Sequence, residues 1–181
     1  MDDIRRAADV VGRMRAMVTK AEPARIDFDA DEAIREVMAL TERERERSGV
    51  KTRAELGPAP ALLHGDRVQF QQVMINLVLN AVEAMRETPQ DERLLLIQSR
   101  PGPGWLDFRV EDRGPGVEAD RQSQIFESLF TTKVGGTGLG LAISKSIVES
   151  HGGVNRRGGG GAAGGGVPGA PAAPARAVAE A

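Results

Sequence analysis

The sequence Gln69-Phe-Gln-Gln-Val-Met-Ile-Asn-Leu-Val-Leu-Asn-Ala-Val-Glu-Ala-Met85 predicts a helix that is apolar around most of its circumference. At about 100° per residue, a narrow polar stripe remains, which contains Gln72, Asn76, Asn80 and Glu83. A helix of this composition is expected to be buried. Buried amides and carboxylates need hydrogen-bond or metal partners, because each unsatisfied group costs about 1–3 kcal/mol. The stripe is therefore a candidate ligand-binding surface.

The stretch Glu111-Asp-Arg-Gly-Pro-Gly-Val117 follows a predicted strand at Trp105–Glu111. The apolar side chains on one face of this strand are those of Leu106, Phe108 and Val110. Asp112 continues that face, so its carboxylate is expected to point toward the interior where the strand ends. Gly114 and Gly116 then permit a sharp turn and a close approach of the backbone to a flat ligand.

A third candidate segment is rich in glycine and leads into a helix. The sequence Gly138-Leu-Gly-Leu-Ala-Ile-Ser-Lys-Ser-Ile-Val148 predicts a helix whose first turn presents backbone N–H groups and a positive dipole end. Both features suit phosphate oxygens, and Lys133 adds a positive charge upstream. The glycines match neither the spacing of a P-loop nor that of a dinucleotide-binding fingerprint. The irregular segment Glu118–Thr137, about 20 residues long, is expected to be a functional or mobile loop such as a lid.

Composition narrows the class of protein. The 181 residues allow one domain with a short appendage, and the net charge of −2 comes from interspersed acidic and basic residues. This composition gives no sign of a nucleic-acid or acidic-lipid surface. Cysteine is absent, which excludes disulfides and thiolate metal sites. No stretch approaches the ~18 apolar residues of a membrane span, so the sequence as written predicts a soluble, unexported protein.

The remaining segments predict ordinary helices and strands. Residues 3–20 predict an amphipathic helix that either packs on the domain or forms half of a helical pairing element. The other predicted elements are a strand at 25–29, a helix at 33–40 that continues into the charged residues 42–47, and strands at 50–56, 61–64 and 94–99, the last pairing with 105–111. Gly49 is expected to end the charged helix, and Asp66 to be the N-cap of the central one. His64 has no ligand-type neighbours at metal spacing and is interpreted as a surface or core histidine.

The end of the chain has a different composition. Gly152–Ala181 consists mostly of Gly, Ala and Pro, without alternation of apolar and polar residues and without an aromatic side chain. Such a segment has little apolar surface to bury. We predict that residues 154–181 are disordered and contain no further strands.

Four of these features occur in an order that is more specific than any one of them. Along the chain they are the helix with Asn76 and Asn80, the strand end Asp112-x-Gly-x-Gly116, the segment Phe126–Lys133, and Gly136-Thr-Gly-Leu-Gly-Leu141. This ordered set resembles the ATP-binding catalytic domain of sensor histidine kinases, in the superfamily that also holds gyrase-type, Hsp90-type and MutL-type ATPases. The four features resemble the asparagine, first glycine, phenylalanine and second glycine boxes. The sequence that follows Asn80, Ala-Val-Glu-Ala, is most similar to the nitrogen-regulation and oxygen-sensing kinases.

The resemblance implies a fold and a division of the chain. The implied fold class is α+β, a two-layer α/β sandwich of the Bergerat type with a mixed sheet. Residues 1–22 resemble the end of the dimerisation and phosphoacceptor helix, and residues 23–153 resemble the ATP-binding catalytic domain, with a lid at about 113–137. The family completes its sheet with two strands after this point, and these are expected to be missing if 154–181 is a disordered tail. A truncated domain and a frameshift would each explain such an ending.

The resemblance also implies roles for individual residues. Asp112 would accept a hydrogen bond from the adenine amino group, Asn80 would bind Mg²⁺ through its side-chain oxygen, and the candidate catalytic residues Asn76 and Glu83 would support the metal and the phosphates. The implied nucleotide contacts are Asn76, Asn80, Asp112, Gly114, Gly116, Thr131, Thr132, Lys133, Gly136, Thr137, Gly138, Leu139 and Gly140. The superfamily's ATPases typically have a glutamate at the position of Asn76. An amide cannot act as a base toward water, so transfer to a protein side chain is favoured over hydrolysis.

The implied cofactors are ATP and Mg²⁺, and the implied function is transfer of the γ-phosphoryl group to a protein histidine in two-component signal transduction. Neither His64 nor His151 lies where the family has its phosphoacceptor. The implied partners are therefore a separate phosphoacceptor domain and a response regulator in the cytoplasm, with no nucleic acid and no membrane segment in this chain. Two alternatives stay open. One is a non-catalytic ATP-binding or dimerising regulator that pairs with another kinase through residues 1–20, and the other is a free-standing ATPase or serine kinase.

Overall fold

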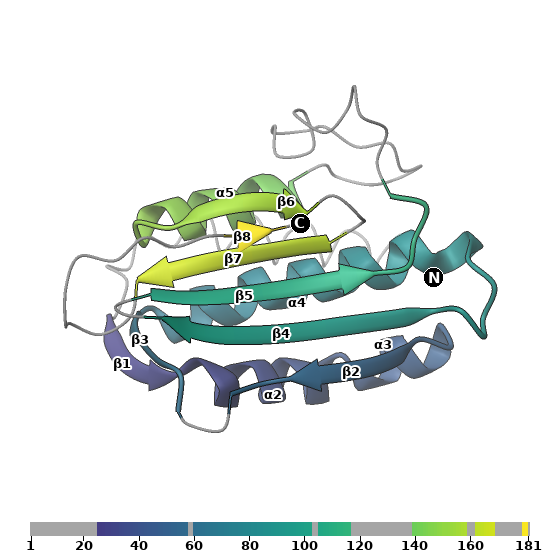
Figure 1. The fold of residues 1–181 in the computed structure, drawn as a ribbon, viewed down its shortest axis with the longest axis horizontal. Coiled ribbons are helices and arrows are strands. Elements are labelled where there is room, and N and C mark those ends of the chain that lie inside the picture. The colour runs from purple at the N-terminus through teal and green to yellow at the C-terminus, as the bar shows by residue number, and fades with distance from the viewer. Residues whose placement is uncertain are drawn as a thin grey trace, which may run out of the picture.

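The structure, a computed structural model, is a mixed β-sheet whose helices lie on one face (Figure 1). The described residues are 25–57, 60–102, 105–116, 139–158, 162–168 and 179–180. Helices and strands alternate irregularly along the chain, as expected for an α+β protein. The predicted fold class, with its mixed sheet, is confirmed.

Helix α4 (Arg67–Ala84) lies between the other long helices and continues into the 3-10 helix η1 (Met85–Glu87). Its buried residues are Phe70, Val73, Met74, Leu77, Val78, Ala81 and Val82. The helix is less completely buried than its sequence predicts, because Val68 is 72% exposed and Leu79 is 38% exposed. The predicted apolar face is thus confirmed as the core face, and other sides of the helix remain available for contacts.

Asp66 is the N-cap of α4, as predicted. Its Oδ1 accepts hydrogen bonds from Val68 N at 2.9 Å and from Gln69 N at 3.0 Å. Replacing Asp66 with alanine is expected to lower the free energy of unfolding by about 1 kcal/mol, because two N–H groups of the first turn lose their partner. Urea unfolding measures this loss. The matched control is Asp91→Ala, at an exposed turn position, and an equal loss in both variants would contradict the prediction.

The strands β4 (Leu94–Gly102) and β5 (Trp105–Asp112) form the predicted antiparallel hairpin. Strand β2 (Lys51–Glu55) pairs with β4 in parallel, which makes the sheet mixed. The hairpin side chains in the core, each at most 2% exposed, are Leu95, Ile97, Leu106, Phe108 and Val110. The predicted face of β5 is therefore correct, and Asp112 lies where that buried face ends.

The N-terminal part of the described chain forms a second, smaller sheet and two helices. Their bounds are β1 (Ile26–Asp29), α2 (Ala30–Leu40), α3 (Glu42–Arg47) and β3 (Leu62–Gly65). Strands β1 and β3 pair antiparallel, so β3 does not join the sheet of β2. Helix α2 contacts α4 through Arg67 Nη2, which donates to Glu36 Oε1 at 2.8 Å. This hydrogen bond holds the pKa of the Glu36 carboxyl below its ordinary value.

The charged run of α3 makes a link that its sequence does not reveal. Arg45 donates from Nη2 to Met38 O at 2.6 Å and from Nη1 to Thr52 Oγ1 at 2.7 Å, which joins the end of α2 to β2. Gly49 ends α3 with a φ of +64°, as predicted for a helix C-terminus. His64 lies beside Asp27 on the exposed side of the small sheet, with 2.7 Å between Nδ1 and Oδ1. His64 is thus a surface histidine, one of the two interpretations that its sequence context left open.

The prediction that no strand follows residue 153 is wrong. Strands β6 (Val154–Gly158) and β7 (Ala162–Pro168) pair antiparallel, β7 pairs with β5, and the short β8 (Ala179–Glu180) also pairs with β5. A β-ladder is made of backbone N–H and C=O groups, so a Gly/Ala segment can pair with an available strand edge without side-chain alternation. The sheet therefore continues beyond β5. The rest of the predicted disordered tail lies outside the described residues.

Helix α5 (Gly140–Ser150) packs against α4 and is followed by His151-Gly-Gly153. Gly152 has a φ of +73°, and Gly153 N donates to Val148 O at 2.8 Å. This is the Schellman arrangement, in which a glycine adopts the left-handed conformation that other residues rarely adopt. The two glycines thus end α5 and direct the chain into β6.

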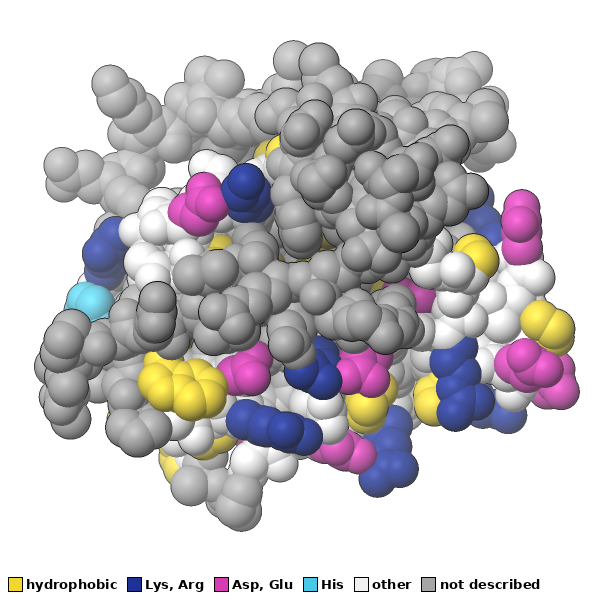
Figure 2. All heavy atoms as spheres, turned by 45° about the horizontal axis from the view of Figure 1, so that its top comes forward, with side chains coloured by type: hydrophobic (Ala, Val, Ile, Leu, Met, Phe, Trp, Pro, Cys, Tyr) yellow, Lys and Arg dark blue, Asp and Glu magenta, His cyan; other side chains and the backbone are white. Residues whose placement is uncertain are grey.

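The surface carries charges of both signs. On the face shown in Figure 2, basic and acidic side chains of the described residues are interspersed. This distribution matches the small net charge of −2. Within the described ranges, no helix combines the length and hydropathy that a membrane span requires.

Candidate functional site

The turn after β5 packs on the C-terminal end of α4. Gly114 N donates to Asp112 Oδ1 at 2.7 Å, so the backbone of the turn orients the carboxylate of Asp112. A Cβ at Gly114 would lie 3.1 Å from both Cβ and O of Ala84, which leaves little room for any side chain. Gly116 follows with a φ of +73°. The predicted sharp turn is therefore present, and it rests directly on the central helix.

The first turn of α5 packs on the polar stripe of α4. Asn76 Nδ2 lies 3.4 Å from Gly140 O and 3.5 Å from Ser144 Oγ, which are long hydrogen bonds. A Cβ at Gly140 would lie 3.7 Å from Asn80 Nδ2 and 3.9 Å from Asn76 Cγ. Asn76 and Gly140 are 64 positions apart in the sequence, and this contact brings them together. Leu139 is the N-cap residue of this helix, at the same place.

These contacts arrange the candidate residues along one side of α4. Asn76 and Asn80 lie next to the N-terminus of α5, and Ala84, one turn beyond Asn80, lies under the Asp112 turn. Glu83, also in this part of the helix, has Oε1 at 3.8 Å from Arg86 Nη1. The site thus combines two amides, a helix N-terminus suited to anions and a carboxylate suited to a hydrogen-bond donor.

Several predicted contact residues lie outside the described residues, and their roles stay predictions. They are Thr131, Thr132, Lys133, Gly136, Thr137 and Gly138. The same holds for residues 117–137 of the predicted lid and for the predicted dimerisation helix at 1–22. The structure therefore describes the asparagine-containing helix, the Asp112 turn and the start of α5.

The donor set of the site fits magnesium. In the described part of the chain, no three His, Cys, Asp or Glu side chains gather into a metal-binding group. Mg²⁺ prefers oxygen ligands and commonly keeps several waters and phosphate oxygens, so it needs only one or two protein ligands. The amide oxygens of Asn76 and Asn80 are ligands of this kind. The stripe suits a magnesium ion that arrives together with phosphates.

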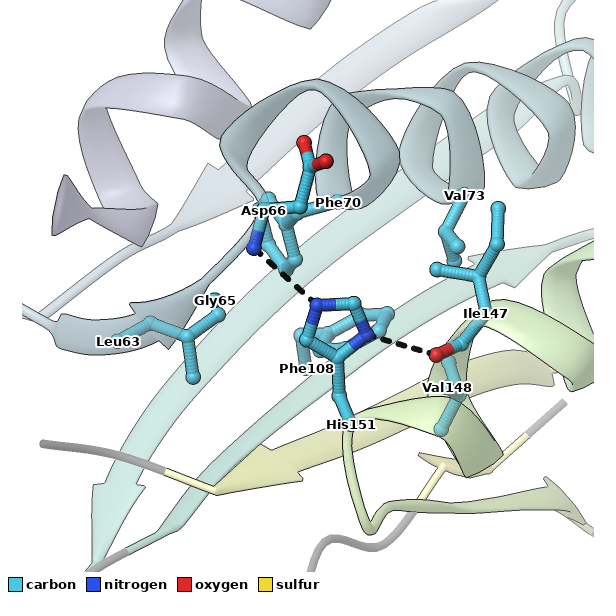
Figure 3. Close-up of a pocket in the computed structure, with 9 residues that line it drawn as sticks. All are labelled: Leu63, Gly65, Asp66, Phe70, Val73, Phe108, Ile147, Val148 and His151. Carbon is cyan, nitrogen blue, oxygen red and sulfur yellow. Dashed lines mark hydrogen bonds between the residues drawn. The ribbon is translucent and has the colours of Figure 1, made fainter. Parts of the chain in front are cut away.

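A small apolar pocket lies near the N-terminal end of α4, away from this site (Figure 3). Its lining residues are Leu63, Gly65, Asp66, Phe70, Val73, Phe108, Ile147, Val148 and His151. His151 Nε2 accepts a hydrogen bond from Asp66 N at 3.1 Å, and Nδ1 lies 2.8 Å from Ile147 O. Gly65 leaves room for the ring, because a Cβ there would lie 2.8 Å from His151 Cδ2. His151 thus joins the end of α5 to the start of α4 and has a packing role.

Sequence reasoning missed the tertiary contacts of four polar side chains: Asp31, Thr88, Arg93 and Ser144. Asp31 is 1% exposed and accepts hydrogen bonds from Gly57 N at 3.1 Å and from Ser99 Oγ. Ser144 Oγ donates to Gly140 O at 3.0 Å in the first turn of α5. The contacts of Asp31, and the bond that Ser144 Oγ accepts from Asn76 Nδ2, join segments distant in sequence, so no local pattern indicates them.

Comparison with known proteins gives evidence that is independent of the geometry. The family model described as "Histidine kinase-, DNA gyrase B-, and HSP90-like ATPase" matches residues 65–165. The sensor protein FixL of Bradyrhizobium diazoefficiens is 36% identical over 148 residues, which cover 82% of this chain and 29% of FixL. The chain therefore spans less than a third of the length of this relative.

Solved structures of histidine kinases are similar in fold. The catalytic domain of ThkA matches with a TM-score of 0.71 and 32% identity, covering 80% of this chain and 95% of that domain. The structure of ThkA in complex with the response regulator TrrA matches with a TM-score of 0.75 and 26% identity. This match covers 92% of this chain and 48% of that one. Full-length ShkA in complex with AMPPNP matches with a TM-score of 0.73 and 26% identity. This match covers 91% of this chain and 35% of that chain. The catalytic-domain match covers nearly the whole of that domain, so the fold of this chain is similar to that of a histidine kinase catalytic domain.

Proposed function

The chain belongs to the family of histidine kinase-, DNA gyrase B- and HSP90-like ATPases, and we propose that it binds Mg-ATP as the catalytic domain of a sensor histidine kinase. The observation that carries this proposal is the order of contacts along α4. Asn76 and Asn80 lie beside the N-terminus of α5, and Ala84 lies beside the Asp112 turn. Groups that suit magnesium and phosphates thus occupy one end of the site, and a carboxylate that suits an amino group occupies the other.

In this proposal the nucleotide lies along α4. Asp112 accepts a hydrogen bond from the adenine amino group, with its carboxylate oriented by Gly114 N. Asn80 holds magnesium through its amide oxygen, and Glu83 supports the metal from the following turn. The phosphates contact the backbone N–H groups before and at the start of α5, from Gly136 to Gly140, together with Thr131, Thr132 and Lys133.

The proposed reaction is transfer of the γ-phosphoryl group to a histidine nitrogen of a separate phosphoacceptor domain. A P–N bond forms while the bond from the γ-phosphorus to the ADP oxygen breaks. Magnesium, when bound, neutralises phosphate charge. Phosphoryl transfer depends mainly on positioning, which the contacts of Asn76 with α5 support. The amide of Asn76 cannot act as a general base that deprotonates water. This favours transfer to a protein nucleophile over hydrolysis.

The proposed partners are a phosphoacceptor domain, a response regulator and, through residues 1–20, a second kinase chain. The ThkA structure in complex with the response regulator TrrA supports the second of these by similarity. We place this function in the cytoplasm, because ATP and the partners of two-component signalling are found there. The proposed dimerising segment, residues 1–20, lies outside the described residues, and its role stays a prediction.

Thermal unfolding with and without Mg-ATP tests the binding proposal. At a free concentration of 100 Kd, Mg-ATP is expected to stabilise the folded state by about 2.7 kcal/mol and to raise the unfolding midpoint. The same concentration of ATP with excess EDTA is the control, and it is expected to give a smaller shift. A folded protein whose midpoint does not move with Mg-ATP, and which releases no heat on titration with it, would refute the proposal.

A further inference from the structure

Arg93, directly before β4, joins the loop after α3 to the segment after α4, and the latter contacts the Asp112 turn. Its guanidinium donates from Nε to Thr88 O at 2.8 Å, from Nη1 to Ser48 O at 2.6 Å and from Nη2 to Arg86 O at 2.8 Å. Two of these carbonyls belong to the segment that follows α4. An arginine that donates to three carbonyls in a fixed geometry restrains the segment that carries them. The path of the chain from Arg86 to Thr88 is therefore set by Arg93.

Thr88 connects this restrained segment to the Asp112 turn. Its backbone N donates to Met85 O at 3.1 Å, and its Oγ1 donates to Arg113 O at 3.2 Å. Arg113 is the residue between Asp112 and Gly114. The hydroxyl of Thr88 therefore holds the Arg113–Gly114 peptide, whose N–H donates to the Asp112 carboxylate.

The same turn has two further restraints. Gly114 N donates to Asp112 Oδ1 at 2.7 Å, and the Cα of Gly114 lies so close to Ala84 that an added Cβ would be 3.1 Å from its Cβ and carbonyl oxygen. These two restraints act within the turn and against α4. Among the described residues, the bond from Thr88 ties the backbone of Arg113 to the segment after α4, so removal of this hydroxyl leaves the Arg113–Gly114 peptide without that anchor.

We propose that Thr88, restrained by Arg93, is a positioning residue that sets base specificity by fixing the Asp112 carboxylate for an amino group on the base. This inference rests on the proposed function. Adenine presents a hydrogen-bond donor at its 6-position, whereas hypoxanthine presents a carbonyl acceptor there. A fixed carboxylate accepts a hydrogen bond from the 6-amino group of adenine and is repelled by the 6-carbonyl of hypoxanthine. The site discriminates strongly between the two bases only if the carboxylate is held rigidly.

The test measures Kd for Mg-ATP and for Mg-ITP by calorimetry in the wild type, Thr88→Val and Thr88→Ser. Valine has nearly the shape of threonine without the hydroxyl, and serine keeps the hydroxyl. The wild type is expected to prefer ATP by about tenfold or more, as one hydrogen bond to a charged group predicts. In Thr88→Val, the ratio of the Kd for Mg-ITP to the Kd for Mg-ATP is expected to be at least about threefold smaller than in the wild type. The change is expected in the Kd for Mg-ATP, with the Kd for Mg-ITP little changed. Thr88→Ser is expected to keep it.

Asp112→Asn is the reference for complete loss of the preference. If it loses the preference and Thr88→Val keeps the wild-type ratio, the positioning role of Thr88 is overturned and the proposed function stands. A wild type that binds neither nucleotide overturns the proposed function itself. Equal losses in the valine and serine variants also overturn the inference, because the hydroxyl is then not the cause. Thr88→Ala gives the same readout if the valine variant does not fold.

Discussion

Replacing Asn80 with alanine is expected to weaken the binding of Mg-ATP by about tenfold or more, because the proposed metal loses its protein oxygen ligand. Asn80, on α4, lies beside the start of α5, where a Cβ at Gly140 would be 3.7 Å from its Nδ2. The affinity for ATP in excess EDTA is expected to change much less. The ratio of the two dissociation constants, measured by calorimetry, therefore falls toward one in the variant.

The matched control is Gln71→Ala, another amide on the same helix. Gln71 Nε2 donates to Glu36 Oε2 at 2.7 Å on the surface between α2 and α4. Gln71 lies nine positions before Asn80, which places it about 180° around the helix. Its removal is expected to leave both dissociation constants unchanged. If Asn80→Ala kept the full effect of magnesium on ATP affinity, the assignment of Asn80 as the metal ligand would be wrong.

The parts of the fold that follow from local periodicity were predictable. The core face of α4, the N-cap at Asp66 and the buried face of β5 each depend on residues within one or two turns or strand repeats. The Asp112 turn followed from glycine spacing for the same reason. The roles of the site residues came from the order of four motifs, which no single motif would have indicated.

The parts that depend on distant contacts were not predictable from patterns. Strands β6 and β7 have no side-chain alternation, and their pairing depends on the backbone edge that β5 offers. Arg93 and Thr88 lie in a short segment between two elements, and their partners are carbonyl groups, which every residue has. A sequence does not mark which carbonyl will be close to a given side chain. The residues that position the site are therefore harder to predict than those proposed to touch the ligand.

Replacing Phe108 with alanine is expected to give the largest loss of stability, about 3–5 kcal/mol. Phe108 is fully buried in the centre of β5, and its ring lies 5.3 Å from that of Phe70 at an interplanar angle of 79°. Phe70 in turn packs on Phe28 of β1, with 5.7 Å between ring centroids. Truncation thus removes the ring that joins the sheet to α4 and leaves a cavity beside the pocket at His151. Urea unfolding measures the loss, and Leu40→Ala, at a side chain that is 70% exposed, is the control expected to stay within about 0.5 kcal/mol.

The same variant separates stability from the site, because Phe108 and Asp112 lie on one face of one strand. Small domains have total stabilities of about 5–15 kcal/mol, so Phe108→Ala should remain partly folded at low temperature. Where it is folded, its affinity for Mg-ATP is expected to be close to that of the wild type, since the Asp112 turn is held by Thr88, Gly114 and Ala84 and not by the Phe108 ring. A loss of stability below about 1 kcal/mol would contradict the packing described for β5. A folded variant with strongly weakened binding would instead mean that the position of Asp112 depends on the core through β5, and that the contacts of the turn with α4 and Thr88 are insufficient to hold it.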